Sequence, residues 1–332
     1  MNSLLKEDVK SRLNLILLVA LVALLVGLAL LKSSYFNQIA ITTMIFVILA
    51  ASMNLITGSA GLLSLGHAGF FGVGAYAAAL LSTGWGWPIG LTIPAAGAVA
   101  ALVGALVVLP TMRLTSIYFA VATLGIGEIL YVTMLNWVGL TRGPMGIRSI
   151  APISLFGQTG TFVSLIVTAL VMLAALWVMH RIVHSYYGNS LRALREDDAC
   201  ADAMGIDVAR LKLESFGVAC FFAGVAGALF AHSTGYIGPE SFRFGESILI
   251  LSLVVVGGLG SIYGSIVGAV LLSVLPELLR DLGSYRMIVV GAVLLLSILF
   301  LPKGLVGEVS ALDLIRRQWR PSRGTLGGRS SW

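Results

Sequence analysis

Long apolar runs separated by short polar segments dominate this chain. Each run is long enough to cross a bilayer as a helix, which takes about 20 residues. The continuous character of the runs excludes a membrane barrel, whose strands alternate apolar and polar positions. The pattern therefore predicts an all-α, polytopic membrane protein with spans at Leu13 to Leu31, Phe36 to Thr57, Ile89 to Leu109, Ile117 to Leu135 and Thr161 to Met179.

The remaining apolar segments raise the predicted number of spans to about ten. Leu62 to Thr83 carries four glycines, while Ser215 to Thr234 and Arg286 to Leu301 are less interrupted. Glu246 to Arg280 is too long for one span, and a glycine-rich break divides it into two short ones. Asn136 to Gly160 reads as a polar loop. An even number of spans places both termini on the same side of the membrane.

A polar island from His180 to Glu214 interrupts the apolar pattern and holds eleven of the 36 charged residues. A segment this polar must lie in water, and it predicts a short helix capped by Asn189 or Ser190. Gly205 can end that helix in the left-handed conformation, and Asp207 can start the next one.

Two interpretations of the island stay open. It is either a solvated connector of mixed charge or a docking helix for a cytosolic partner. In the second case an apolar edge would enter a groove on the partner while charged side chains set the register. The residues concerned are Leu191, Leu194, Met204 and Gly205 for the edge and its end, and Arg192, Arg195 and Glu196 for the charges.

Composition agrees with a membrane location and supplies an orientation. The 332 residues are 58% hydrophobic, with a mean hydropathy of +0.98 and a net charge of +6. Ten spans with the island in the cytoplasm put fifteen lysines and arginines inside and six outside, as the positive-inside rule requires. The basic charge is thus explained by orientation and lipid contact, and nucleic acid need not be invoked.

Two glycine-rich stretches, Thr57 to Tyr76 and Val254 to Ala269, are the second informative feature. They serve either for close helix packing alone or for broken helices that line a translocation path. Similar breaks in the two halves would fit an inverted repeat of Phe36 to Leu135 and Ser215 to Leu301. The path candidates are Ser64, Gly66, His67, Gly69, Glu128, Gly257, Gly258 and Gly260.

Ionisable residues within spans are few, and such residues are functional candidates in a membrane. His67 could equally be a packing residue that ties a broken helix together, and Glu128 could bridge to a neighbouring helix. No histidine or cysteine has metal-ligand spacing, and Cys200 and Cys220 suggest no disulfide. None of the five lysines follows a glycine, so the chain has no P-loop for a nucleotide.

Five motifs in order along the chain resemble the branched-chain amino acid ABC transporter permeases of the LivM type. The resemblance covers about Phe36 to Gly304, outside the first span and the basic tail. It rests on SLGHAGFFGVGAY (64–76), ATLGIGEI (122–129), TRGPMGI (141–147), LRALREDDACADAMGID (191–207) and VVGGLGSIYGSIVGA (255–269).

The resemblance implies a multi-pass permease of the bacterial inner membrane that works with several partners and no cofactor. These are a second permease of the LivH type, two ABC ATPase subunits and a periplasmic binding protein. The island would then be the coupling loop for an ATPase. The chain departs from the usual pattern at Ser59, Gly69 and Gly188-Asn189, and relatives of this type also carry urea and short amides.

The sequence therefore predicts one permease domain over residues 1–332. Within it lie a cytoplasmic coupling loop at 180–214 and a basic cytoplasmic tail at 302–332. It is expected to form half of an ATP-driven path and not to be an enzyme. The rival hypothesis is a stand-alone channel or facilitator for small polar solutes. A binding protein would dock on the outer loops, at Arg142, Arg148, Glu240 and Arg243.

Overall fold

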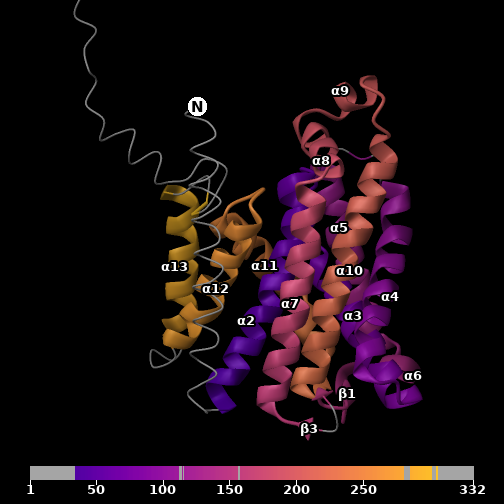
Figure 1. The fold of residues 1–332 in the computed structure, drawn as a ribbon, viewed down its shortest axis with the longest axis vertical. Coiled ribbons are helices and arrows are strands. Elements are labelled where there is room, and N and C mark those ends of the chain that lie inside the picture. Colours follow the sequence, from indigo (N-terminus) through magenta and orange to yellow (C-terminus); the bar gives the residue numbers. More distant parts are fainter. Residues whose placement is uncertain are drawn as a thin grey trace, which may run out of the picture.

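The computed structural model describes residues 34–111, 114, 116–155, 158–279, 285–300 and 304–305. The predicted first span and, apart from 304–305, the basic tail lie outside these residues. Helices make up nearly all of the described chain (Figure 1). The longer ones are α2 (Ser34–Asn54), α3 (His67–Trp85), α4 (Ile89–Thr111), α5 (Ser116–Asn136), α7 (Thr161–Val183), α10 (Val208–Thr234), α11 (Phe244–Gly257), α12 (Ile262–Leu278) and α13 (Tyr285–Phe300).

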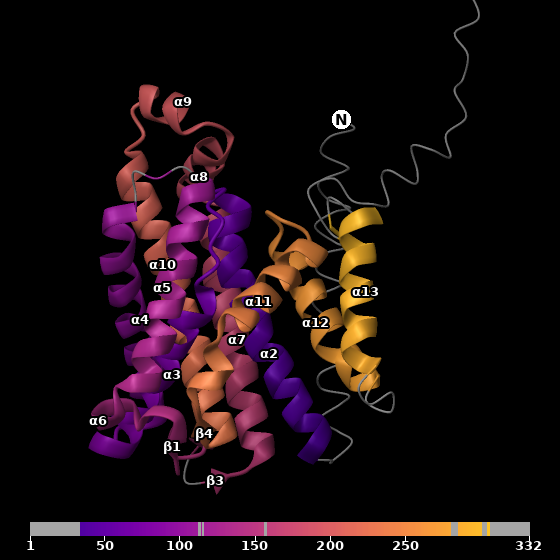
Figure 2. The same ribbon diagram turned by 180° about the vertical axis from the view of Figure 1, so that it is seen from behind.

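The shorter elements gather at the two ends of this helical bundle. Helices α8 (Tyr186–Glu196) and α9 (Asp198–Ala203) project from one end, at the top of Figure 1. Helix α6 (Val138–Thr141) and the strands β1 (Ile147–Arg148), β3 (Gln158–Thr159) and β4 (Tyr236–Ile237) lie at the other (Figure 2). We refer to these as the α8–α9 end and the β1–β4 end.

Helix α10 forms the centre of the bundle and packs against α3, α4 and α2. Small residues allow this packing, because helices in lipid associate through close backbone contact. A Cβ atom placed on Gly74 of α3 would lie 2.2 Å from the Cα atom of Gly224 in α10. A Cβ atom on Gly227 of α10 would likewise lie 2.2 Å from the Phe71 carbonyl oxygen of α3, so the absence of side chains at Gly74 and Gly227 allows this close approach.

Five described helical segments are long and apolar enough to cross a membrane individually: Ser34–Ser59, Ile89–Thr111, Ile117–Asn136, Thr161–Val183 and Val208–Thr234. They confirm an all-α membrane protein and agree with five of the predicted spans. The bent pair α11 and α12 would add a sixth span if it crossed as one unit. The predicted count of ten is not confirmed.

The first glycine-rich stretch is a broken helix, as its composition predicts. Helix α2 ends in a π-helical turn, η1 (Leu55–Ser59), and residues 60–66 are not helical. Helix α3 begins at His67, so the predicted span from Leu62 starts five residues too early. Most of α3 is buried in the bundle.

The second glycine-rich stretch also breaks a helix. Helices α11 and α12 meet at a bend of 119° around Gly258 and Gly260, so the predicted division of this segment is confirmed. Helices α2 and α10 run in opposite directions, as an inverted repeat requires (Figure 1). The repeat itself stays a prediction.

Two contacts tie the loops together at the β1–β4 end. Strand β1, after α5, pairs antiparallel with β4, after α10, and Ile147 faces Ile237. Close by, His232 contacts the Ala151 carbonyl at 2.8 Å through Nδ1 and Thr92 Oγ1 at 3.1 Å through Nε2. The polar loop predicted at Asn136 to Gly160 is therefore attached to the end of α10. It also contains η2 (Gly143–Met145) and the strand pair β2 (Ser154–Leu155) and β3.

Candidate functional site

The polar island forms two helices instead of the one expected. Helix α8 begins at Tyr186, before the predicted caps Asn189 and Ser190, and ends at Glu196. Asp197 adopts an extended conformation and accepts a hydrogen bond from the Cys200 amide, which starts α9. Hydrogen bonds from the backbone amides of Cys200 and Ala199 lower the pKa of the Asp197 carboxyl group. The predicted roles of Gly205, at φ +83°, and Asp207, which caps α10, are confirmed.

The apolar edge of α8 faces its own chain. Leu191 and Leu194 lie three residues apart on one helical face and are only 0% and 2% exposed. Burying two such side chains stabilises the docked helix by about 3–6 kcal/mol before entropic costs. The expectation that these leucines are free to enter a groove on a partner is therefore wrong. Met204 is 83% exposed and remains available at the surface.

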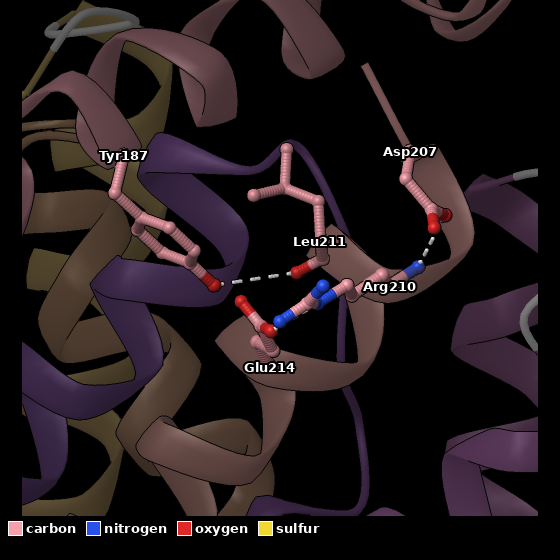
Figure 3. Close-up of polar contacts among 5 residues, drawn as sticks. All are labelled: Tyr187, Asp207, Arg210, Leu211 and Glu214. Atoms are coloured by element: carbon pink, nitrogen blue, oxygen red, sulfur yellow. Dashed lines mark hydrogen bonds and ion pairs between the residues drawn. The ribbon is translucent and has the colours of Figure 1, made fainter.

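Hydrogen bonds hold the start of α8 against the neighbouring helices (Figure 3). The Tyr187 hydroxyl donates to the Leu211 carbonyl in the first turns of α10, at 3.5 Å. Burial, together with the nearby Glu214 carboxylate, raises the pKa of this phenol. Arg210 and Glu214 form an exposed ion pair at 2.7 Å beside it, and the Arg210 amide donates to Asp207.

Charged groups attach the rest of the island in the same way. Lys212 of α10 is almost completely buried and pairs with Asp198 at the start of α9. Arg192 donates through Nη2 to the Val183 carbonyl at the end of α7, at 3.1 Å. The α8–α9 layer is thus fixed to the bundle, while Glu196 and Asp202 remain exposed on its surface.

Arg195 links this layer to both glycine breaks. Its Nη1 donates to the Gly58 carbonyl in η1 at 2.7 Å. The same nitrogen lies 3.0 Å from where a Cβ atom of Gly260 would be, and Arg195 Cγ lies 3.1 Å from that position on Gly61. The sequence predicted a charge on the rim of a docking surface. Arg195 is indeed exposed, and its guanidinium group also reaches the place where the two broken helices meet.

Asn54 also joins the two breaks. Its Nδ2 donates to the Ser261 carbonyl and to Ser265 Oγ, both at 2.8 Å. Its Oδ1 accepts from the Gly260 amide, also at 2.8 Å. The side chain is 2% exposed, so these bonds satisfy a buried amide and fix the bend between α11 and α12 to the end of α2.

Side chains from other helices bind the backbone amides freed at the start of α3. The Leu65 amide donates to Thr123 Oγ1 of α5 at 3.1 Å, and the Ala68 amide donates to Ser247 Oγ of α11 at 3.0 Å. His67 Nε2 lies 2.8 Å from Ser52 Oγ of α2. This contact matches the interpretation of His67 as a tie across the broken helix.

The predicted path residues belong to the two glycine-rich breaks and to the α5 segment that packs on the first of them. Ser64 and His67 are fully buried, and Ser64 Oγ and His67 Nδ1 have no hydrogen-bond partner in the described part of the chain. Gly66 and Gly69 pack against the backbone of Gly127 in α5, next to Glu128, while Gly257 packs against Gly264 across the second break. The shared role of these residues in a path stays a prediction.

The four predicted docking residues belong to the β1–β4 end. Arg148 lies over the Tyr236 ring at 5.7 Å. Arg243 forms an exposed ion pair with Glu240 at 3.2 Å and lies over the Tyr131 ring at 5.8 Å. Arg142 takes the left-handed conformation, at φ +61°, directly after α6. This cluster and the α8–α9 layer therefore lie at opposite ends of the bundle (Figure 2).

Several residues that organise the site were missed at the sequence level. Asn54, Ser52, Thr123 and Ser247 are short polar residues inside apolar helices. Their polarity is the only signal that could have found them, since each binds a partner in another segment of the chain.

A broken-helix bundle of this kind, with a polar layer at one end, defines the chain as a helical membrane protein. Residues 35–298 match the family described as the permease component of branched-chain amino acid transport systems. The chain therefore belongs to this family of permeases and is a transport subunit, not an enzyme.

The curated relatives include both permease types that the resemblance implies. The chain is 37% identical to the high-affinity branched-chain amino acid transport permease LivM of Escherichia coli K12 over 314 residues, 87% of this chain and 74% of that protein. It is 26% identical to LivH of the same organism over 292 residues, 79% and 91% of the two chains. A probable LivM of Methanocaldococcus jannaschii is 25% identical over 226 residues, 62% and 65% of the two chains. No solved structure matches the chain.

Proposed function

We propose that this permease forms half of the translocation path of an ATP-driven importer for branched-chain or related amino acids. Its partners would be a second LivH-type permease, two ABC ATPase subunits and a periplasmic binding protein. Two observations support this. The chain is similar to both LivM and LivH, and its sequence has no P-loop, so energy for uphill transport must come from another subunit.

The link from Arg195 to the glycine breaks is the observation that carries the proposal. The α8–α9 layer presents Glu196, Asp202 and Met204 outward. On its inner side Arg195 donates to Gly58 of η1 and lies beside Gly260 at the α11–α12 bend. An ATPase pair that pushes on the outer surface of this layer would therefore move both broken helices together. A connector without a coupling role would need no such contact.

The proposed contact with the ATPase subunits also sets the orientation of the permease in the membrane, because these subunits would lie in the cytoplasm. The α8–α9 end would face the cytoplasm of a bacterial inner membrane, and both termini would lie on that side. The β1–β4 end would face the periplasm, where Arg142, Arg148, Glu240 and Arg243 would meet the binding protein. The glycine breaks, with Ser64, Gly66, His67, Gly69, Glu128, Gly257, Gly258 and Gly260, would line or gate the path between the two ends.

Reconstitution tests this proposal. The chain should be co-expressed with its neighbouring transport subunits, purified as a complex and placed in proteoliposomes with radiolabelled leucine. We expect ATPase and second-permease subunits to co-purify and leucine uptake to require ATP. Uptake that proceeds equally without ATP would instead favour the stand-alone facilitator. ATP-driven uptake of urea or short amides, without leucine, would keep the importer and change its substrate.

A further inference from the structure

A hollow opens between α7 and α12 near the α8–α9 end. Its volume is about 380 Å³, and pockets for small molecules span roughly 300–1,000 Å³. Four residues of α7 and three of α12 line it. Helix α2 packs against both of these helices and lies between them in Figure 1. The hollow is thus a space between two helices that a third one separates.

The lining of the hollow changes from apolar to polar toward the α8–α9 end. Helix α7 runs toward this end, so Leu173 lies about two turns deeper in the bundle than His180. Helix α12 starts at the second break and runs away from this end (Figure 1), so Ile266 lies deeper than Tyr263. An apolar interior with an aromatic and polar rim matches the change from hydrocarbon to head groups in one leaflet of a bilayer.

Three hydrogen-bond donors at this rim have no acceptor among the described residues. The guanidinium group of Arg181 lies over the ring of Trp177, which lines the hollow, at 5.5 Å from the ring centroid. The rings of His180 and Tyr263 meet across the hollow, with centroids 6.0 Å apart. Within the described part of the chain, Arg181 forms no ion pair, and none of the three side chains makes a hydrogen bond.

These donors suit an anion that carries an apolar chain. Arginine binds phosphate oxygens through two parallel N–H bonds, and a histidine N–H and a tyrosine hydroxyl can donate to the same group. Basic pockets between membrane helices bind the head groups of anionic lipids. No aspartate or glutamate belongs to the described lining of the hollow, so the ammonium group of a zwitterionic head group would find no carboxylate there.

We propose that this hollow binds an anionic phospholipid. Arg181, His180 and Tyr263 donate hydrogen bonds to its phosphate, and part of one acyl chain lies between α7 and α12. Helix α7 leads into the α8–α9 layer and α12 starts at the second break, so the bound lipid would bridge the layer and the break from the membrane side. Arg195 makes the corresponding link through the protein.

Fluorescence of Trp177 measures occupancy of the hollow directly. The full-length permease is placed in phosphatidylcholine vesicles that contain a small fraction of brominated phosphatidylglycerol or of brominated phosphatidylcholine, because bromine quenches nearby tryptophan. The difference between the wild type and Trp177→Phe isolates the signal of Trp177. We expect half of this signal to be lost at an about fivefold lower fraction of phosphatidylglycerol, since one basic residue contributes about that factor toward an anionic lipid.

Arg181→Ala and Tyr263→Phe each remove a donor and should reduce this preference, and the double variant should show none. Neither change breaks a hydrogen bond in the described part of the chain, so both proteins should fold and melt like the wild type. Arg210→Ala is the matched control, because Arg210 lies at the same end of the molecule but is paired with Glu214. It should keep the wild-type preference.

Three results would overturn the proposal. The first is equal quenching by the two lipids in the wild type, and the second is a preference that survives the double variant. The third is a Trp177 that neither lipid quenches, which would show that protein, such as the predicted first span at Leu13 to Leu31, fills the hollow. The vesicle test does not involve transport, so the importer and the lipid site stand or fall separately.

Discussion

The guanidinium group of Arg195 donates a hydrogen bond of 2.7 Å to the carbonyl oxygen of Gly58, across 137 residues of sequence. Arg195 belongs to α8, and Gly58 belongs to the π-helical turn that ends α2. The contact reaches a backbone atom, so it depends on the path of the chain and not on the side chain of its acceptor. Any displacement of α8 must either carry the end of α2 with it or break this bond.

Replacing Arg195 should uncouple ATP hydrolysis from transport. Arg195→Ala removes the bond to Gly58 and leaves space beside Gly61 and Gly260. We expect leucine uptake per ATP hydrolysed to fall by about tenfold, because hydrogen bonds from charged donors contribute about 1.5–3 kcal/mol. Arg195→Lys keeps the charge but loses the planar fork, so partial coupling should remain. Both quantities can be measured on the same proteoliposomes.

Arg210→Ala provides the matched control for this experiment. Arg210 lies at the same end of the molecule, but its partner is the exposed Glu214, and surface pairs of this kind contribute only about 0–1 kcal/mol. Its coupling ratio should stay at the wild-type level. Equal uncoupling by the two alanine variants would refute a special role for Arg195.

Asn54→Ala should destabilise the permease itself. The change removes three hydrogen bonds and leaves the Gly260 amide, the Ser261 carbonyl and the Ser265 hydroxyl without this partner. The expected loss is at least about 2 kcal/mol of unfolding free energy. Thermal unfolding in detergent measures it. Asn37→Ala on the same helix is the control, since Asn37 Oδ1 is buried and has no hydrogen-bond partner among the described residues. A similar fall in Tm there would contradict the assignment.

Truncating the α8 leucines should act on stability before it acts on assembly. Leu191→Ala and Leu194→Ala each remove a buried side chain, which costs about 2–5 kcal/mol. Met204→Ala changes an exposed side chain and should stay within about 0.5 kcal/mol of wild type. Melting curves decide between these outcomes. If Leu191→Ala melted normally yet lost the ATPase subunits, the leucine would be facing a partner after all.

A methyl group on Gly74 should push the two central helices apart. Its Cβ atom would lie 2.2 Å from Gly224 Cα, so α3 or α10 must shift, at about 1–3 kcal/mol or more. Gly84→Ala on the same helix meets open space and should be neutral or slightly stabilising. The yield of folded protein in detergent, followed by size exclusion, reports the difference. Equal behaviour of the two variants would show that the close approach is not needed.

The two native cysteines report the orientation without any mutation. Cys200 is exposed on α9, whereas Cys220 is fully buried in α10. A membrane-impermeant maleimide should label Cys200 in inside-out vesicles and leave intact spheroplasts unlabelled. Cys200→Ser should abolish labelling of the folded protein. Labelling of Cys200 from the periplasmic side would overturn the proposed topology.

The apolar pattern predicted the positions of the spans well, because the length of a membrane helix is set by the bilayer and needs no partner. The ends were less accurate where a helix continues into water. Helix α10 begins at Val208, seven residues before the predicted span at Ser215. These seven residues belong to the helix that Asp207 was predicted to start, and their charges are paired on it, Arg210 with Glu214 and Lys212 with Asp198.

The candidate site was harder to predict, because tertiary contacts define it. The sequence showed that Leu191 and Leu194 share a face, but it could not show that the chain itself covers that face. It predicted Arg195 as a surface charge, which its exposure bears out, but it could not show that the guanidinium group binds the backbone of Gly58. The break at Asp197 was also missed, since the residues around it are compatible with one continuous helix.

The bonds of Asn54 have a consequence for how the protein is made. Its three partners lie 206, 207 and 211 residues further along the chain. A ribosome adds about 5–20 residues per second, so α2 waits for roughly 10–40 seconds with a polar amide that has not met its native partners. During this time α2 depends on lipid, water or a chaperone to accommodate that group. The amino-terminal half is thus an intermediate of biogenesis that only the synthesis of α12 completes.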